Sequence, residues 1–181
     1  MSSSPFAGTR FVTVTTTYLE IPAQAQFRPA WAQWRHHADV QVQIAHEPLP
    51  AFYRFLYGTV GKDYYWRDRL SWSDERLHTY LSQPSVTLMV LYVRGTPVGY
   101  VELNTASDEP GTEVAYFGLI PQFHGRGLGK YLLSVGIQQA YDDGAKRVWV
   151  HTCTLDGSHA LANYQARGFV LYRSVSAEMW L

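Results

Sequence analysis

The sequence predicts a single α/β domain with a mixed, mostly antiparallel sheet, one parallel pair of strands and helices on both faces. Three observations support this prediction. The chain of 181 residues is long enough to bury the core of one domain. Residues 86–120 form successive strand-like segments joined by short turns, which indicates an antiparallel meander. Strands then alternate with helices after residue 112, which predicts parallel pairing of the strands around Val114 and Val148.

The elements before residue 86 are predicted from composition and side-chain periodicity. Threonine, valine and tyrosine favour a strand over residues 11–21, and a connection without a clear period follows over 22–38. Apolar residues alternate with glutamines over 40–44, as in a strand with one buried face. Residues 50–60 and 73–82 have the pattern of helices, and a serine stands at the capping position of the second.

The elements after residue 86 alternate regularly between strands and helices. The meander is predicted to contain strands over 86–93, 97–104 and 113–120. A helix follows the glycine-rich segment and ends near Tyr141, where Asp-Asp-Gly terminates it. The remaining elements are, in order, a strand over 147–154, a helix over 158–167 and a final strand from Phe169 onward.

Composition and charge narrow the class of protein. Fifteen basic and fifteen acidic side chains balance, so neither nucleic acid nor an anionic membrane is expected as a partner. Cys153 is the only cysteine, which excludes an intrachain disulfide and fits a reducing compartment. No apolar run reaches the roughly 20 residues of a membrane span, and the N-terminal residues do not resemble a signal peptide. A cytoplasmic location is therefore expected.

The most informative segment is Gln122 to Lys130, where a predicted strand is followed by a glycine-rich turn and then by a helix. Its three alternate glycines let main-chain amides at the helix start converge on a phosphate, and the helix dipole adds positive charge there. The spacing differs from that of a Walker loop, because His124 and Tyr131 occupy the required glycine and hydroxyl positions. It also differs from a dinucleotide-binding turn, because residue 130 is lysine.

Two motifs in order resemble the GNAT (GCN5-related N-acetyltransferase) superfamily, and the chain is similar to its bacterial-type members. The first is Gln122-x-x-Gly125-x-Gly127, which resembles the loop that binds the pyrophosphate of acetyl-coenzyme A. The second is Ala160-x-x-x-Tyr164-x-x-x-Gly168-Phe169, which resembles a short family helix that a glycine ends. The resemblance covers about residues 40–172 and leaves residues 1–38 as an N-terminal extension with an added strand.

The resemblance implies a GNAT fold in which two central strands splay apart to form a V-shaped cleft for acetyl-coenzyme A, the cosubstrate. The pantetheine arm would lie against backbone groups near Leu119, and the pyrophosphate would rest on Gly125 to Lys130. The residues implied in cofactor binding are Leu119, Ile120, Gln122, Gly125, Arg126, Gly127, Leu128, Gly129, Lys130 and Asn163. No metal is expected, because the histidines and Cys153 lack the clustered spacing of a zinc site.

Acetyl transfer to an amine requires a base, because an ammonium with a pKa near ~10 has no lone pair with which to attack. Glu113 is the first candidate, since it lies six residues before Leu119, the offset of the catalytic glutamate in the family's histone acetyltransferases. Glu102 on the neighbouring strand is the alternative, and either glutamate is also compatible with an ordinary strand position. Tyr164 matches the family tyrosine that acts as general acid toward the departing thiolate, and a role in packing on the sheet is the alternative.

Two features depart from the family pattern. Gly157 stands where the family often has an asparagine that bonds the pantetheine arm, and Asp156 or Asn163 would have to replace it. Only about twelve residues follow Gly168-Phe169, which is enough for one strand rather than the usual two. Either the extra N-terminal strand or a second copy in a homodimer would then complete the sheet.

The acceptor pocket is implied for the segment between the first two helices, where charged residues flank Tyr64, Tyr65 and Trp66. Ring faces and carboxylates suit an amine, although an aromatic core layer would have the same composition. The expected function is acetyl-coenzyme A dependent N-acetyltransfer to a primary amine, small molecule or peptide, by direct transfer. The alternative is a catalytically silent module of the same fold that binds acetyl-coenzyme A as a sensor or assembly subunit.

Overall fold

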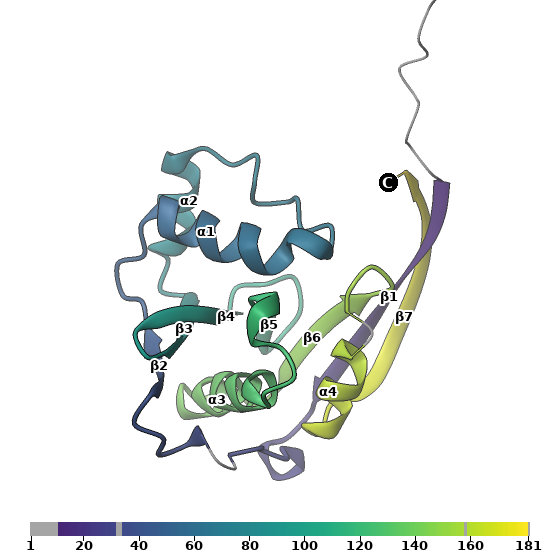
Figure 1. The fold of residues 1–181 in the computed structure, drawn as a ribbon. Helices are drawn as coiled ribbons and strands as arrows, with labels where there is room; N and C mark the ends of the chain where they lie inside the picture. The colour runs from purple at the N-terminus through teal and green to yellow at the C-terminus, as the bar shows by residue number, and fades with distance from the viewer. Residues whose placement is uncertain (1–10, 32–33, 158, 181) are drawn as a thin grey trace, which may run out of the picture.

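In the computed structural model, which describes residues 11–31, 34–157 and 159–180, seven strands form one mixed sheet in the order β2-β3-β4-β5-β6-β1-β7 (Figure 1). The strands are β1 (Phe11–Ile21), β2 (Val40–Ile44), β3 (Val86–Val93), β4 (Thr96–Asn104), β5 (Thr112–Leu119), β6 (Val148–Cys153) and β7 (Val170–Trp180). The α-helices are α1 (Pro50–Val60), α2 (Asp74–Leu81), α3 (Leu128–Asp142) and α4 (Ala160–Ala166). The predicted fold class is confirmed, with boundaries within two residues; Ser158, where one helix was predicted to begin, lies outside the described residues.

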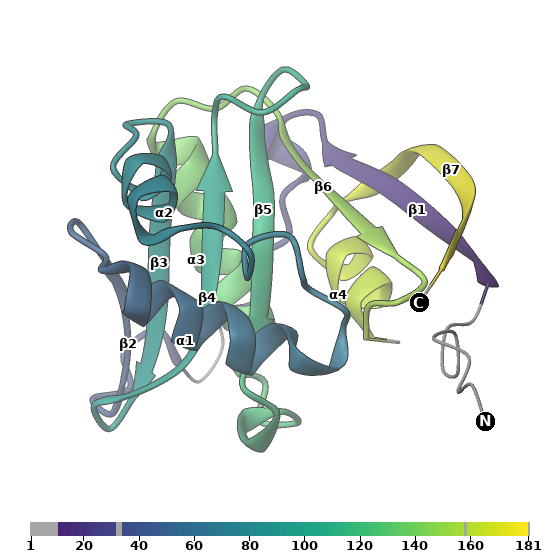
Figure 2. The same ribbon diagram turned by 90° about the horizontal axis from the view of Figure 1, so that it is seen from above.

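The sheet separates two hydrophobic clusters. Helices α1 and α2 lie on one face of the sheet and α3 on the other, as Figures 1 and 2 show. Leu56 of α1 packs in one cluster with Tyr100 of β4, whereas Leu132 of α3 packs in the other with Val101 and with Tyr164 of α4. Successive residues of β4 therefore enter different clusters, as expected of a central strand that is buried on both faces.

Helices α1, α2 and α3 begin in different ways. The Ser73 hydroxyl accepts a hydrogen bond of 3.2 Å from the amide of Arg76, which confirms the predicted cap of α2. Pro50 begins α1. The first N–H groups of a helix have no partner within it, so a proline at this position costs no helix hydrogen bond. Helix α3 begins after Gly127, which has no side chain to cap the first turn, so the amides of that turn remain open.

The two central strands pair in parallel over a short distance and then separate. Strand β5 pairs with β6 only at Thr112 with Val148 and at Glu113 with Trp149. This confirms the predicted parallel pair. Beyond Glu113, β5 keeps its hydrogen bonds to β4 and β6 keeps its hydrogen bonds to β1, so a gap opens between the two strands.

The N-terminal strand is inserted into the sheet rather than added at its edge. β1 pairs antiparallel with β7 over almost its full length, and residues 16–21 of β1 also pair antiparallel with β6 on the other side. It therefore supplies the strand that the short C-terminus was predicted to lack. Leu19 and Ile21 of β1 are fully buried in the cluster that contains α3.

A β-bulge in β5 sets which side chains face α1 and α2. Leu103 pairs with Val114 and Glu102 with Tyr116, so Ala115 has no partner in β4. Glu113 and Tyr116 are three positions apart, and in a regular strand residues at an odd spacing point to opposite faces. The extra residue of the bulge instead brings both to the face of the sheet that Glu102 occupies. Without this bulge, Glu113 and Tyr116 would lie on opposite faces.

Candidate active site

A pocket of about 650 Å³ lies between the diverging strands β5 and β6. Residues 114–119 of β5 form one wall, and His151 and Cys153 of β6 contribute to another. The glycine-rich loop, helix α4 and the segment that contains residues 64–66 complete the lining. The pocket therefore brings together the segments that the sequence assigned separately to the cofactor and to the acceptor.

The glycine-rich loop presents a row of main-chain amides at the start of α3. Gly125 and Gly127 have φ angles of 75° and 76°, in the left-handed region that favours glycine. Among the described residues, no main-chain or side-chain acceptor takes a hydrogen bond from the amides of residues 125–130. Open amides and the positive end of the helix dipole favour an anion at this position.

Six of the ten residues implied in cofactor binding line the pocket: Leu119, Gly125, Gly127, Gly129, Lys130 and Asn163. The other four lie outside the lining. Arg126 stacks over the Phe123 ring at 4.8 Å and donates a hydrogen bond of 3.0 Å to the Gln122 carbonyl, so it folds back on the loop. Ile120 and Leu128 are buried in the hydrophobic clusters and fix the two ends of the loop.

The carbonyl of Leu119 faces the gap between the strands. The amide of Ile120 donates to the Val98 carbonyl of β4 at 2.8 Å, so the Leu119 carbonyl of the same peptide group points away from β4. The Nε2 atom of His124 lies 3.0 Å from this oxygen. Because a carbonyl oxygen has two lone pairs, it can accept from His124 and from a ligand amide together.

Tyr164 lies in the pocket wall with two phenylalanine rings beside it. The ring centroids of Phe117 and Phe169 lie 6.2 and 5.6 Å from that of Tyr164, both in edge-on arrangements. Tyr164 lines the pocket although only 6% of its surface is exposed. Burial, and then the charge of Asp156, raise the pKa of the phenol well above its usual value. The hydroxyl is therefore neutral at physiological pH and available as a hydrogen-bond donor.

Glu113 lies behind the pocket wall, next to a histidine. Its side chain is 12% exposed, and its Oε1 atom lies 3.5 Å from Nε2 of His151, which lines the pocket. Burial, and then the nearby carboxylates of Glu102 and Asp108, raise the pKa of Glu113 to about 7. A carboxylate with this pKa can accept a proton near neutral pH.

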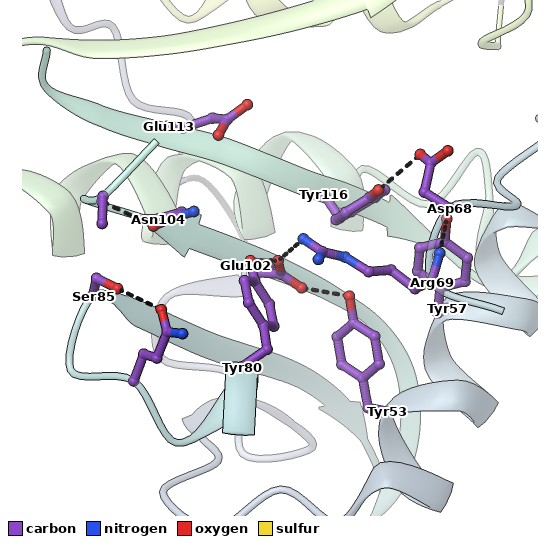
Figure 3. A network of polar contacts seen from close by, with 12 residues as sticks. Tyr53, Tyr57, Asp68, Arg69, Tyr80, Ser85, Glu102, Asn104, Glu113 and Tyr116 are labelled. Carbon is purple, nitrogen blue, oxygen red and sulfur yellow. Dashed lines mark hydrogen bonds and ion pairs between the residues drawn. The ribbon is translucent and has the colours of Figure 1, made fainter. Parts of the chain in front are cut away.

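Glu102, the alternative base, is fully buried and does not line the pocket. The hydroxyls of Tyr53 and Tyr80 each donate to its carboxylate at 2.6 Å, and Nη2 of Arg69 lies 3.5 Å from it (Figure 3). The Arg69 guanidinium also lies 4.1 Å from the ring centroids of Tyr80 and Trp72. Glu102 therefore fixes α1, α2 and the loop between them to the sheet.

The aromatic segment lines the side of the pocket below α1. Trp66 packs at 5.0 Å against Tyr116 of β5, and Tyr64 and Tyr65 also line the pocket. The hydroxyl of Tyr116 donates at 3.1 Å to Asp68, and Figure 3 shows the contact between these two side chains. Ring faces and a carboxylate are thus both available to an acceptor amine.

Gly157, which stands at the position of the family asparagine, lies beside the ring of Tyr64. A Cβ atom on Gly157 would lie 3.4 Å from the ring of Tyr64, which is an ordinary contact distance. Asp156 accepts hydrogen bonds from the Thr152 hydroxyl at 2.6 Å and from the Cys153 amide at 2.9 Å, and closes the turn after β6. Asn163 lines the pocket.

Sequence reasoning gave no acceptor or proton-transfer role to His151 or Tyr116, and it included Asp68 only as a charged neighbour of the aromatic segment. For His151, the sequence does contain a signal that could have placed it. Trp149, His151 and Cys153 alternate along β6, so they share one face of that strand. Once β6 is placed parallel to β5, this face of β6 must lie beside Glu113. No comparable signal reveals Tyr116, because its position depends on the bulge.

The pKa of Glu113 gives a testable effect on stability. Because this pKa is higher in the folded chain than its value of 4.5 in an unfolded one, folding takes up a proton between pH 4.5 and about 7. Stability is therefore lost as the pH rises through this window. At about 1.4 kcal/mol per pH unit, the ionised side chain costs about 3 kcal/mol above pH 7.

We expect Glu113→Gln to be more stable than the parent by about 3 kcal/mol at pH 8 and equally stable below pH 4.5. Urea unfolding of both proteins across this pH range measures the difference. A difference that does not change with pH would contradict the assigned pKa.

The chain belongs to the GNAT family of acetyltransferases. The model described as "Acetyltransferase (GNAT) family" matches residues 43–169, which lie within the range that the two motifs indicated. The match defines the class of domain that these residues form, a GNAT acetyltransferase domain.

Solved structures of this class share the fold. A GCN5-related N-acetyltransferase from Kribbella flavida is 17% identical with a TM-score of 0.63, and the match covers 94% of this chain and 59% of that one. The corresponding protein from Sphaerobacter thermophilus is 16% identical, with a TM-score of 0.63 and coverages of 96% and 53%. An aminoglycoside acetyltransferase from an uncultured soil metagenomic sample, in complex with trehalose, is 20% identical, with a TM-score of 0.57 and coverages of 71% and 87%.

The chain spans less than two thirds of the length of the first two of these structures. No curated protein matches the sequence. Within the described residues, no group of three or more histidine, cysteine or acidic side chains is arranged to hold a metal ion. None of the helices in the same residues is long and apolar enough to cross a membrane.

Proposed function

We propose that this protein is an acetyl-coenzyme A dependent N-acetyltransferase that acts on a primary amine. One observation carries the proposal. Gly125, Gly127, Gly129 and Lys130, from the loop with the open amides, line the same pocket as Tyr164 and His151, so a candidate anion site and two proton-handling groups share one cavity. The aromatic segment and Asp68 line that cavity too and give a cationic acceptor a place to bind.

The residues of the loop suit a coenzyme A molecule. Amides at the start of α3 suit a diphosphate, and Lys130 lines the pocket there with a compensating charge. The unpaired edge of β5 near Leu119 offers main-chain groups to the amides of the pantetheine arm, in the manner of an added strand. When bound, the cofactor supplies a thioester, whose carbonyl carbon is the electrophile.

Glu113 is the proposed general base, in preference to Glu102. With a pKa of about 7, Glu113 is partly ionised at neutral pH, and it is connected to the pocket through His151. Glu102 is fully buried and already accepts hydrogen bonds from two tyrosines. An acceptor in the pocket therefore has a path to Glu113 and none to Glu102.

Tyr164 is the proposed general acid for the departing thiolate. Its raised pKa makes the phenol a weaker acid than a thiol of pKa ~8.5, so a free tyrosinate is unfavourable. The hydroxyl therefore gives its proton to sulfur as it recovers one from the acetylated nitrogen. This concerted exchange requires no free tyrosinate.

The test is thiol release from acetyl-coenzyme A, measured with the full chain across a panel of primary amines of different size and charge. Binding is measured separately by thermal shift with coenzyme A and with ATP. The proposal predicts release with at least one amine, and stabilisation by coenzyme A but not by ATP. Tight binding of coenzyme A without release for any amine would instead identify a catalytically silent sensor or assembly module.

A matched pair of glycine variants tests the anion site. Gly125 and Gly144 both have positive φ angles, of 75° and 92°, and a Cβ atom on either would meet no atom within 4 Å. Gly125→Ala and Gly144→Ala should therefore lose similar stability, of about 1 kcal/mol each. Only Gly125→Ala should weaken coenzyme A binding, by roughly tenfold, because strain at residue 125 moves the amides of the loop. Equal binding by the two variants would contradict the assignment of the loop.

Tyr164→Phe removes the donor and keeps the ring packing against Phe117 and Phe169. We expect kcat to fall by roughly 10- to 100-fold with little change in KM for acetyl-coenzyme A, because the lost bond acts on the leaving group. Steady-state kinetics measure both constants. A kcat within about twofold of the parent would remove Tyr164 from the reaction.

A further inference from the structure

The proposed base is separated from the pocket by another side chain. Glu113 is 12% exposed and is not part of the pocket lining, whereas the His151 side chain is 47% exposed and is part of it. The two groups are 3.5 Å apart, from Nε2 of His151 to Oε1 of Glu113. An amine that enters the pocket therefore meets His151 first.

The divergence of β5 and β6 produces this arrangement. Glu113 and Trp149 form the last parallel pair, and His151 follows two residues later on the same face of β6. At that position the strands have begun to separate, so the imidazole occupies the narrow end of the gap. The ring centroids of Tyr18 and Trp149 lie 5.8 and 6.2 Å from that of His151, so both rings pack against the imidazole.

We infer that His151 is a further catalytic residue, which carries the proton of the acceptor amine to Glu113. The inference rests on the proposed acetyltransferase function. Its support is the order of the groups from the pocket inward: the open pocket, then the imidazole, then the buried carboxylate. The 3.5 Å separation is long for a hydrogen bond, but catalytic contacts often shorten when the substrate binds.

The relay accounts for every proton. The acceptor ammonium gives one proton to Nδ1 of His151 as the proton on Nε2 passes to Glu113. The neutral amine then attacks the thioester carbon, a C–N bond forms and the C–S bond breaks. Sulfur takes the phenol proton of Tyr164, and the second nitrogen proton restores the phenol. Nδ1 of His151 finally releases its proton to solvent as Glu113 returns its proton to Nε2, which restores both His151 and Glu113 to their starting states.

The charges around His151 are compatible with a relay that starts from a neutral ring. Besides Glu113 of β5, the charged groups near His151 are Asp68, Asp156 after β6 and Arg173 of β7. Burial lowers the pKa of His151, and Arg173 lowers it further, while the two aspartates oppose this shift. A neutral imidazole has one donor nitrogen and one acceptor nitrogen, as a relay requires.

The kinetic test compares His151→Gln with His78→Gln, a matched change on the exposed side of α2. We expect His151→Gln to lower kcat by roughly 100-fold and to leave KM for acetyl-coenzyme A within about twofold, because glutamine cannot relay a proton. His78→Gln should keep the parent kinetics. His151→Ala should regain activity when imidazole is added. Parent-like kcat in His151→Gln, or no rescue of His151→Ala, would overturn the inference.

A second measurement needs no substrate. The ¹⁵N shifts of the His151 ring report which nitrogen carries the proton, and the relay requires Nε2–H facing Glu113. We expect that tautomer in the parent at pH 8, and a changed tautomer ratio in Glu113→Gln. An Nδ1–H ring, or a ratio that Glu113→Gln leaves unchanged, would overturn the inference.

The two proposals fail in different ways. If the parent protein releases no thiol with any amine, the acetyltransferase function fails, and the ring measurement still reports whether His151 contacts Glu113. If the parent is active and His151→Gln is equally active, the relay fails and the function stands.

Discussion

Glu113→Gln is expected to lower kcat at pH 7 by roughly 100-fold or more, the usual range for loss of a general base. Glutamine keeps the size of the side chain but cannot accept a proton. Because Glu113 lies outside the pocket lining, the affinity for acetyl-coenzyme A should stay within about twofold of the parent. Thiol release gives kcat, and isothermal titration with coenzyme A gives the affinity.

The pH profile makes this expectation specific. In the parent, kcat should rise with pH through a midpoint near 7, because only ionised Glu113 accepts the proton of the amine. Glu113→Gln should lose this rise. Glu75→Gln, an exposed change on α2, is the matched control and should keep the parent profile. A Glu113→Gln variant with parent-like turnover would show that the base lies elsewhere.

Glu102→Leu is expected to destabilise the fold by about 3–5 kcal/mol, because it leaves Arg69 largely buried without its carboxylate and two tyrosine hydroxyls without their acceptor. For a chain of this length, that loss corresponds to a decrease in Tm of roughly 10 °C. Calorimetry or urea unfolding measures it. The large effect reflects the position of Glu102, where α1, α2 and the sheet meet (Figure 3).

A double variant distinguishes the stability that comes from the Arg69–Glu102 ion pair from the stability that comes from packing of the two side chains. Arg69→Met with Glu102→Leu replaces both charges by apolar groups, so it should recover much of the stability that Glu102→Leu loses. The coupling between the two substitutions should be about 1–3 kcal/mol. Additive losses would show that Arg69 and Glu102 contribute independently and would contradict the ion pair as the anchor.

Much of the fold could be predicted because its signals are local. Alternation over residues 40–44, a serine before α2 and glycines at the start of α3 each depend on a few neighbouring positions. The phosphate-type loop was predicted for the same reason, since its chemistry lies in one continuous segment. The placement of Glu113 beside β6 also follows from the sequence once the parallel pair is assigned.

The remaining features depend on contacts between distant segments. The bulge at Ala115 moves Tyr116 to the face of Glu102, and no residue type in this segment predicts a bulge. Glu102 matched the pattern of a strand glutamate, but its burial depends on hydroxyls from α1 and α2. The contact of Gly157 with the ring of Tyr64 joins two segments that lie almost a hundred residues apart in the chain.

β1 lies between β6 and β7 in the sheet, although residues 11–21 lie outside the segment that matches the family model. The folded unit is therefore larger than the segment that the family model covers. A polypeptide restricted to residues 43–169 would lack both β1 and β7, and one edge of β6 would expose unpaired main-chain groups. It would also lose Leu19 and Ile21 from the interior. Cooperative unfolding of this protein should therefore include its N-terminal strand, whose hydrogen bonds keep β6, and with it His151, at the pocket wall.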